Sequence, residues 1–247
     1  THFSERLRTA AAAKQAMLSV VGDLGHRIRS GLAPSPGPAG DLVGCGAGEE
    51  VFETTEGDPI VCVNRDPKGP VLDAFTEVVI GLKAVGGTPL SGTLEAVSPK
   101  ILGLPGKTIV VLMTDGAPNC NLEASCGADE CMLNIEGAQV FSGTCEGDYN
   151  CCDPELQNET GVLDPQTWCV DTKASTDVLE ELNEAGVETY VVGVPGSEAY
   201  ADVMEQLAEA GGTTRDGKVG YYDVKDVTEL TDALRSLTEA ELEGLQK

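Results

Sequence analysis

The sequence predicts an α/β fold, a three-layer, doubly wound and mostly parallel sheet. A length of 247 residues suits one large α/β domain, which we expect to span residues 1–247. Residues 109–113 form a short, continuous, apolar run, typical of a central strand buried on both faces. From residue 173 onward, helix-type and strand-type patterns alternate, as they do in successive βα units.

The individual elements follow from apolar periodicity. Apolar residues at three- and four-residue steps predict a helix over residues 4–24, with Ser4 as its N-cap. Residues 26–32 and 50–54 favour strands. The remaining expected elements are helices over 71–85 and 89–102, strand 109–113, helix 173–185, strand 187–194, helix 198–210, strand 221–224 and helix 226–243.

The charge balance excludes several partners. The chain has 41 acidic and 16 basic residues, a formal net charge of −25. Nucleic-acid binding needs clustered Lys and Arg, and an anionic membrane surface would repel this chain. No apolar run is long enough to cross a bilayer. We therefore expect neither nucleic acid nor membrane insertion, and we interpret most of the acidity as a solvated surface.

The cysteines indicate an oxidising compartment. Seven of the nine fall between residues 120 and 169, and the absence of Cys-x-x-Cys pairs, with only two histidines, disfavours zinc. We expect a disulfide-stapled inserted subdomain over residues 117–170, in a protein that is extracellular, at the cell surface or periplasmic. The pairing stays open, a Cys45–Cys62 bond included, and one cysteine is left over. The candidates are Cys45, Cys62, Cys120, Cys126, Cys131, Cys145, Cys151, Cys152 and Cys169.

Two loops carry oxygen-bearing side chains at positions where α/β sheets bind ligands. Thr88 lies in a Gly-Gly-Thr-Pro turn before a predicted helix. Asp115 follows the strand predicted at 109–113, after Thr114, with Asn119 just beyond. Each has a plain structural interpretation: Thr88 as an N-cap followed by proline, and Asp-Gly as a turn dipeptide. Taken together, at the carboxyl ends of parallel strands, they favour a functional site.

These loops resemble those of the von Willebrand factor A domain. The Gly-Gly-Thr-Pro turn is similar to the family's second metal-site loop, and Val-Leu-Met-Thr-Asp-Gly is similar to its third. The continuation into a Cys-rich insertion is similar to exported A domains of myxobacterial type. The resemblance implies a metal-ion-dependent adhesion site for Mg²⁺, or Mn²⁺ or Ca²⁺, with Thr88 and Asp115 as ligands. It places Gly87, Gly116 and Asn119 in the surrounding loops.

The first strand of this family and its Asp-x-Ser-x-Ser loop are absent from the sequence. The resemblance therefore implies that a central strand lies upstream of residue 1, and that this chain binds the metal weakly. A coordination position that the chain leaves open would take a carboxylate from an acidic residue of a protein partner.

The leading hypothesis is an extracellular adhesion or protein-binding module without catalysis. One alternative is a metal-dependent hydrolase that uses Asp115, and the other is a purely structural domain. The hydrolase requires a second acid near Asp115, or a basic residue that holds a phosphate, and the sequence after Asp115 supplies neither.

Overall fold

The computed structural model describes residues 2–37, 45–58, 69–83, 87–121, 139–140, 143–144, 169–213 and 220–244. Most of the predicted insertion lies outside these residues. Between residues 122 and 168, the structure describes only the short antiparallel pair of β4 (Gln139–Val140) and β5 (Gly143–Thr144). The disulfide-stapled insertion over 117–170 therefore stays a prediction.

A parallel three-stranded sheet forms the centre of the described fold. Its order is β3 (Ile109–Thr114), β6 (Glu188–Gly193) and β7 (Tyr222–Asp223). β3 and β6 pair along their full lengths, so that Thr114 at the end of one lies opposite Gly193 at the end of the other. β1 (Arg29–Leu32) and β2 (Phe52–Glu56) form a separate antiparallel pair. Parallel pairing is confirmed for the three strands, whereas the complete doubly wound sheet stays a prediction.

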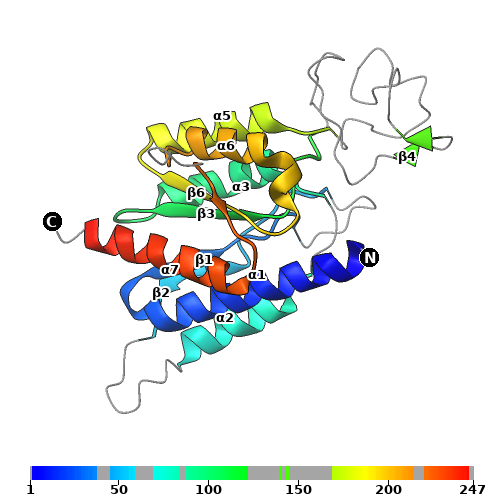
Figure 1. The fold of residues 1–247 in the computed structure, drawn as a ribbon. Coiled ribbons are helices and arrows are strands. Elements are labelled where there is room, and N and C mark those ends of the chain that lie inside the picture. Colours follow the sequence, from blue (N-terminus) through cyan, green and yellow to red (C-terminus); the bar gives the residue numbers. More distant parts are fainter. Residues whose placement is uncertain are drawn as a thin grey trace.

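Helices cover both faces of this sheet (Figure 1). Successive side chains of a strand point to opposite faces. Accordingly, Val110 and Leu112 of β3 pack in one apolar cluster, and Val111 and Met113 pack in another. The first cluster includes side chains of α3 (Leu90–Leu102), α5 (Thr172–Glu184) and α6 (Ala201–Ala210); the second includes those of α1 (His2–Leu24) and α7 (Val227–Gly244).

The antiparallel pair has its own helical cover, α2 (Pro70–Gly81), which packs against α1 and β2. The rings of Phe52 and Phe75 meet edge to face, with their centroids 5.1 Å apart. Phe75 and Val79 of α2 are buried. They lie four residues apart on the face of the helix that packs inward, which is the apolar spacing that predicted the helix.

Strand β3 is not the fully buried strand that its sequence predicts. Residues 109–113 are only half-buried, whereas Val191 and Val192 of the neighbouring β6 are fully buried. Among the described strands, β3 pairs with β6 alone. The expectation of full burial is wrong because one edge of β3 has no covering strand within the described part of the chain.

Several element boundaries differ from the predictions. Ser4 is not an N-cap, because α1 already begins at His2. The predicted strand 50–54 is shifted to Phe52–Glu56, and α2 ends at Gly81 instead of residue 85. Two short 3₁₀ helices, η1 (Gly25–Arg27) and η3 (Ser197–Tyr200), occupy the starts of the predicted strand 26–32 and helix 198–210. Apolar periodicity marks the middle of an element more sharply than its ends.

A cluster of charged and polar side chains ties α7 to the amino ends of β3 and β6. The Lys107 ammonium lies 2.5 Å from Glu241 and 3.0 Å from Glu188. The Tyr190 hydroxyl donates a hydrogen bond of 2.5 Å to the other oxygen of Glu241. Burial opposes ionisation of Glu241, but the hydrogen bonds from Lys107 and Tyr190 outweigh it and hold the pKa of Glu241 below its ordinary value.

Glu241→Gln should lower the free energy of unfolding at pH 7 by about 1 kcal/mol, because it removes the charge that Lys107 and Tyr190 engage. A lowered folded-state pKa stabilises the protein above the ordinary carboxyl pKa, and this contribution is lost as the pH falls. The difference from the parent should therefore shrink below pH 4.5, the ordinary value. Urea titrations at several pH values measure it. Glu239→Gln, at an exposed position of the same helix, is the matched control. Equal losses for both variants would contradict the role of the cluster.

Candidate functional site

The carboxyl ends of β3 and β6 bring two loops together. The Val194 N–H donates to the Thr114 carbonyl over 3.0 Å, which extends the strand pairing by one bond. Beyond it, Gly196 has a φ of +119° and packs on the backbone of Asp115, where an added Cβ would lie 3.1 Å from the Asp115 carbonyl oxygen. The loop after β6 thus supports the backbone of the residue that the sequence singles out as a ligand.

Thr88 and Asn119 are joined by a reciprocal pair of hydrogen bonds. The Thr88 N–H donates to Oδ1 of Asn119 over 2.6 Å, and the Asn119 N–H donates to the Thr88 carbonyl over 2.8 Å. Asn119 is only 1 % exposed. We call this arrangement the Thr88–Asn119 clasp. It brings together two of the residues that the sequence places in the site, although 31 positions separate them.

The N-cap interpretation of Thr88 is wrong. Helix α3 begins at Leu90, its N-cap is Pro89, and no side chain caps it. The Leu90 N–H instead reaches the Thr88 carbonyl over 2.7 Å. Among the described residues, the Thr88 hydroxyl has no hydrogen-bond partner, and neither has the exposed Asp115 carboxylate. Within the described residues, both oxygens that the resemblance implies as ligands are therefore unengaged.

Asp115 begins a tight turn at the end of β3. Thr114 Oγ1 donates to the Gly116 carbonyl over 2.7 Å and accepts the Gly116 N–H over 3.2 Å. The turn interpretation of Asp115-Gly116 thus describes the backbone correctly. It does not account for the Asp115 carboxylate, which this turn leaves unused.

Sequence reasoning missed a buried carboxylate beside these loops. Asp171, 5 % exposed, accepts hydrogen bonds from the Ser91 hydroxyl over 2.6 Å and from the Asn121 amide over 3.0 Å. Its own N–H donates to the Pro118 carbonyl over 2.8 Å. Asp171 therefore ties together the starts of α3 and α5 and the loop after β3.

Burial raises the pKa of Asp171 above its ordinary value, although hydrogen bonds from Ser91, Asn121 and the Ala174 backbone favour its ionised form. In the sequence, Asp171 is one acidic residue of 41. Its position before a predicted helix suggests only a local cap, so no sequence signal points to the contact with Ser91, 80 residues away.

A disulfide joins the loop after β3 to the segment after β1. It links Cys45 to Cys120, the residue that follows Asn119. The open alternative of a Cys45–Cys62 bond is therefore wrong. Cys169 is buried and disulfide-bonded as well. The remaining cysteine predictions fall on residues outside the described part of the chain.

The donor set fits a divalent cation only in part. A hydroxyl and a carboxylate are oxygen ligands of the kind that Mg²⁺ and Ca²⁺ prefer, and Mg²⁺ commonly keeps several waters. Within the described residues, no group of three or more His, Cys, Asp or Glu side chains is placed to hold a metal. Thr88 and Asp115 as metal ligands, with Gly87, Gly116 and Asn119 around them, therefore stay a prediction.

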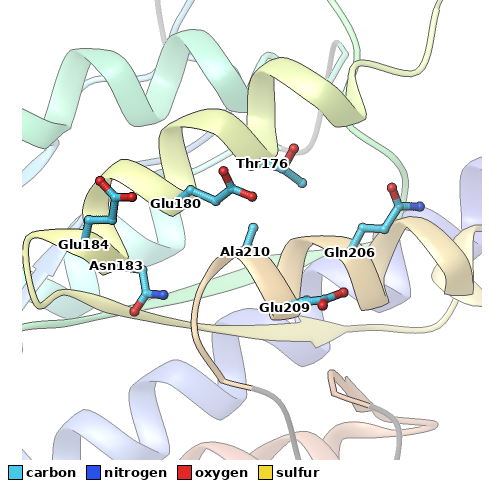
Figure 2. A pocket seen from close by; sticks show the side chains of 7 residues that line it. All are labelled: Thr176, Glu180, Asn183, Glu184, Gln206, Glu209 and Ala210. Carbon is cyan, nitrogen blue, oxygen red and sulfur yellow. The ribbon is translucent and has the colours of Figure 1, made fainter.

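A surface groove lies between α5 and α6 (Figure 2). Glu180 and Glu184 of α5 and Glu209 of α6 are exposed beside it. α5 ends at Glu184, before the amino end of β6, and the Thr189 N–H of β6 donates to the Gly211 carbonyl directly after α6. The groove is a solvated acidic surface and provides a reference for non-specific cation attraction.

Comparison with known proteins adds a likeness of fold. No protein-family model matches the sequence, and no curated protein matches it significantly. Two crystal structures of the pilus adhesin SpaC from Lactobacillus rhamnosus GG are similar to the chain. The open conformation has a TM-score of 0.56 at 14 % identity over 95 % of this chain. The second structure has a TM-score of 0.53 at 15 % identity over 97 % of this chain.

The chain spans 28 % of the length of that adhesin chain in both structures. At this level of identity, the likeness shows that the chain shares its fold with part of a bacterial pilus adhesin. Membership of the von Willebrand factor A family stays a prediction.

Asp171→Ala should lower the free energy of unfolding by about 1–3 kcal/mol, because Ser91 and Asn121 lose a buried acceptor. Asp171→Asn keeps an acceptor oxygen and removes the buried charge, so its stability at pH 7 should equal or exceed that of the parent. A raised folded-state pKa means that the parent loses stability as the pH rises above 3.8, the ordinary value, and the Asn variant should not share this loss. Thermal unfolding at several pH values measures both. An Asn variant as unstable as the Ala variant would contradict the assignment.

Proposed function

We propose that this chain is the ligand-binding module of an extracellular adhesin, and that it binds a protein partner through a divalent cation held by Thr88 and Asp115. The observation that carries the proposal is the pair of oxygens at the carboxyl edge of the parallel sheet, which no other described residue engages. The fold likeness to part of a pilus adhesin supports it. Binding, without catalysis, is the whole of the proposed activity.

The chemistry of the two side chains supports a bridging ion. A neutral hydroxyl and a single carboxylate leave most of the charge of a divalent cation uncompensated, and water fills the remaining positions. A carboxylate from a partner then replaces one water and neutralises further charge. Because the protein surface is strongly acidic, such a partner would be repelled unless the ion were present.

We further propose that β3 pairs, on its open edge, with a parallel strand that carries the Asp-x-Ser-x-Ser loop, as in the von Willebrand factor A fold. The half-buried apolar residues 109–113 support this arrangement. A strand beside β3 would end at the same edge as Asp115, and would bring its serine hydroxyls to the same place. Without that strand, we expect the chain to bind the metal weakly.

Two observations support a compartment outside the cytosol. Cys45 and Cys120 form a disulfide, and such bonds persist in oxidising environments. The fold is shared with part of a pilus adhesin. Among the described helices, none has the length and apolar character needed to span a bilayer. We propose an extracellular or cell-surface location.

Thr88→Ala and Asp115→Ala should each weaken Mn²⁺ binding about tenfold or more, the effect of losing roughly 1.4 kcal/mol of coordination free energy. Isothermal titration of the chain with MnCl₂ measures this. Glu209→Gln, in the acidic groove between α5 and α6, is the matched control and should leave the affinity unchanged.

Two outcomes of this titration, and one of a separate hydrolysis assay, would contradict parts of the proposal. Loss of affinity in Glu209→Gln, with no change in Asp115→Ala, would place the ion on the acidic surface. A submicromolar affinity of the chain would refute the need for a further strand. Mg²⁺-dependent hydrolysis of p-nitrophenyl phosphate that is abolished by Asp115→Ala would favour the hydrolase instead.

A further inference from the structure

The Cys45–Cys120 disulfide lies directly against the candidate site. Cys120 follows Asn119, and its backbone adopts a φ of +71°, which is uncommon for a residue with a side chain. The bond closes a separation of 75 residues between the loop after β3 and the segment after β1. Neither of these segments belongs to a helix or strand, so their relative position depends on specific contacts.

The disulfide lies so close to the Thr88 loop that it leaves no room for a side chain at Gly87. A Cβ added to Gly87 would overlap Sγ of Cys120 and would lie 3.5 Å from Sγ of Cys45. It would also lie 2.9 Å from Oδ1 of Asn119, the atom that accepts the Thr88 N–H. Only glycine allows this approach, which explains the second glycine of the Gly-Gly-Thr-Pro turn without reference to its φ angle.

The other end of the disulfide is anchored on α3. The Gly48 N–H donates to the Thr93 hydroxyl over 2.7 Å, and Glu50 forms an ion pair with Lys100. The segment that carries Cys45 is therefore fixed on the helix that follows Thr88. The covalent bond connects this fixed segment to the loop that carries Asn119, across the Thr88–Asn119 clasp.

We propose that the Cys45–Cys120 disulfide positions Thr88 by holding the Thr88–Asn119 clasp closed. Two hydrogen bonds between loops offset only part of the conformational entropy that is lost when both loops are ordered. A covalent link removes much of that entropy from the competing open states. Cys45, Cys120 and Gly87 are thus positioning residues; their relevance to metal binding rests on the proposed function, whereas the positioning itself does not.

Hydrogen exchange measured by NMR on the metal-free chain tests the proposal. In Cys45→Ser/Cys120→Ser, the Thr88 and Asn119 amides should exchange about tenfold faster or more, because their hydrogen bonds open locally. The Val191 amide in β6 should keep its protection. Replacing both cysteines together leaves no thiol of this pair free to mispair.

Two further variants make the outcome decisive. Gly87→Ala keeps both cysteines but forces a Cβ onto Sγ of Cys120, and it should accelerate exchange at Thr88 in the same way. Lys107→Met removes an ion pair at the opposite end of the sheet, and it should lower global stability without a selective effect at Thr88.

Unchanged Thr88 and Asn119 exchange in the double serine variant would overturn the proposal. If that variant loses protection throughout β3 and β6, Gly87→Ala decides: parent-like exchange at Thr88 overturns the proposal, and selective acceleration supports it. The exchange measurement uses the metal-free chain. If the separate titration found no Mn²⁺ binding, the proposed function would be refuted, but the exchange result would stand.

Discussion

The parallel pairing of β3 with β6 is the constraint on which the rest of the structure depends. Because the two strands run together over six residue pairs, both end at one edge, and the loops after Thr114 and Gly193 meet there. Because both faces of β3 carry apolar side chains, helices must cover the sheet on both sides. Thr88, which lies just before α3, is at the same edge, where its N–H donates a hydrogen bond to Asn119. The candidate site follows from strand direction before any particular ligand is considered.

Much of this arrangement could be predicted from the sequence because it depends on local periodicity. The run 109–113 predicted a strand, and the alternation after residue 173 predicted parallel neighbours for it, as observed. The failures involve contacts distant in sequence. The Thr88 interpretation failed because an N-cap motif was present but the helix begins at Leu90, one residue later than that motif requires. The Cys45–Cys120 bond and the Ser91–Asp171 contact join residues 75 and 80 positions apart, and no periodic pattern encodes such pairs.

Several independent ties hold the loop after β3. Asn119 binds the Thr88 loop, Cys120 is bonded to Cys45, and Asn121 donates to the buried Asp171. Residues 117–119 are fully buried, while Asp115, at the start of the loop, is exposed. A rigid loop that presents one exposed carboxylate is suited to ligand binding, because little conformational entropy is lost when the ligand arrives. Because the net charge is −25, cations are attracted to the whole acidic surface, so a specific cation site must be distinguished from this general attraction.

The location of a bound ion therefore tests the account most directly. Paramagnetic Mn²⁺, added in small amounts to isotopically labelled protein, broadens the NMR signals of nuclei near the ion even when binding is weak. The account predicts that the amide signals of Thr88, Asp115 and Gly116 broaden first, while those of Glu184 and Glu209 in the acidic groove stay sharp. Broadening that begins at Glu184 and Glu209, or that spreads evenly over the acidic surface, would contradict a metal site at the carboxyl edge of the sheet.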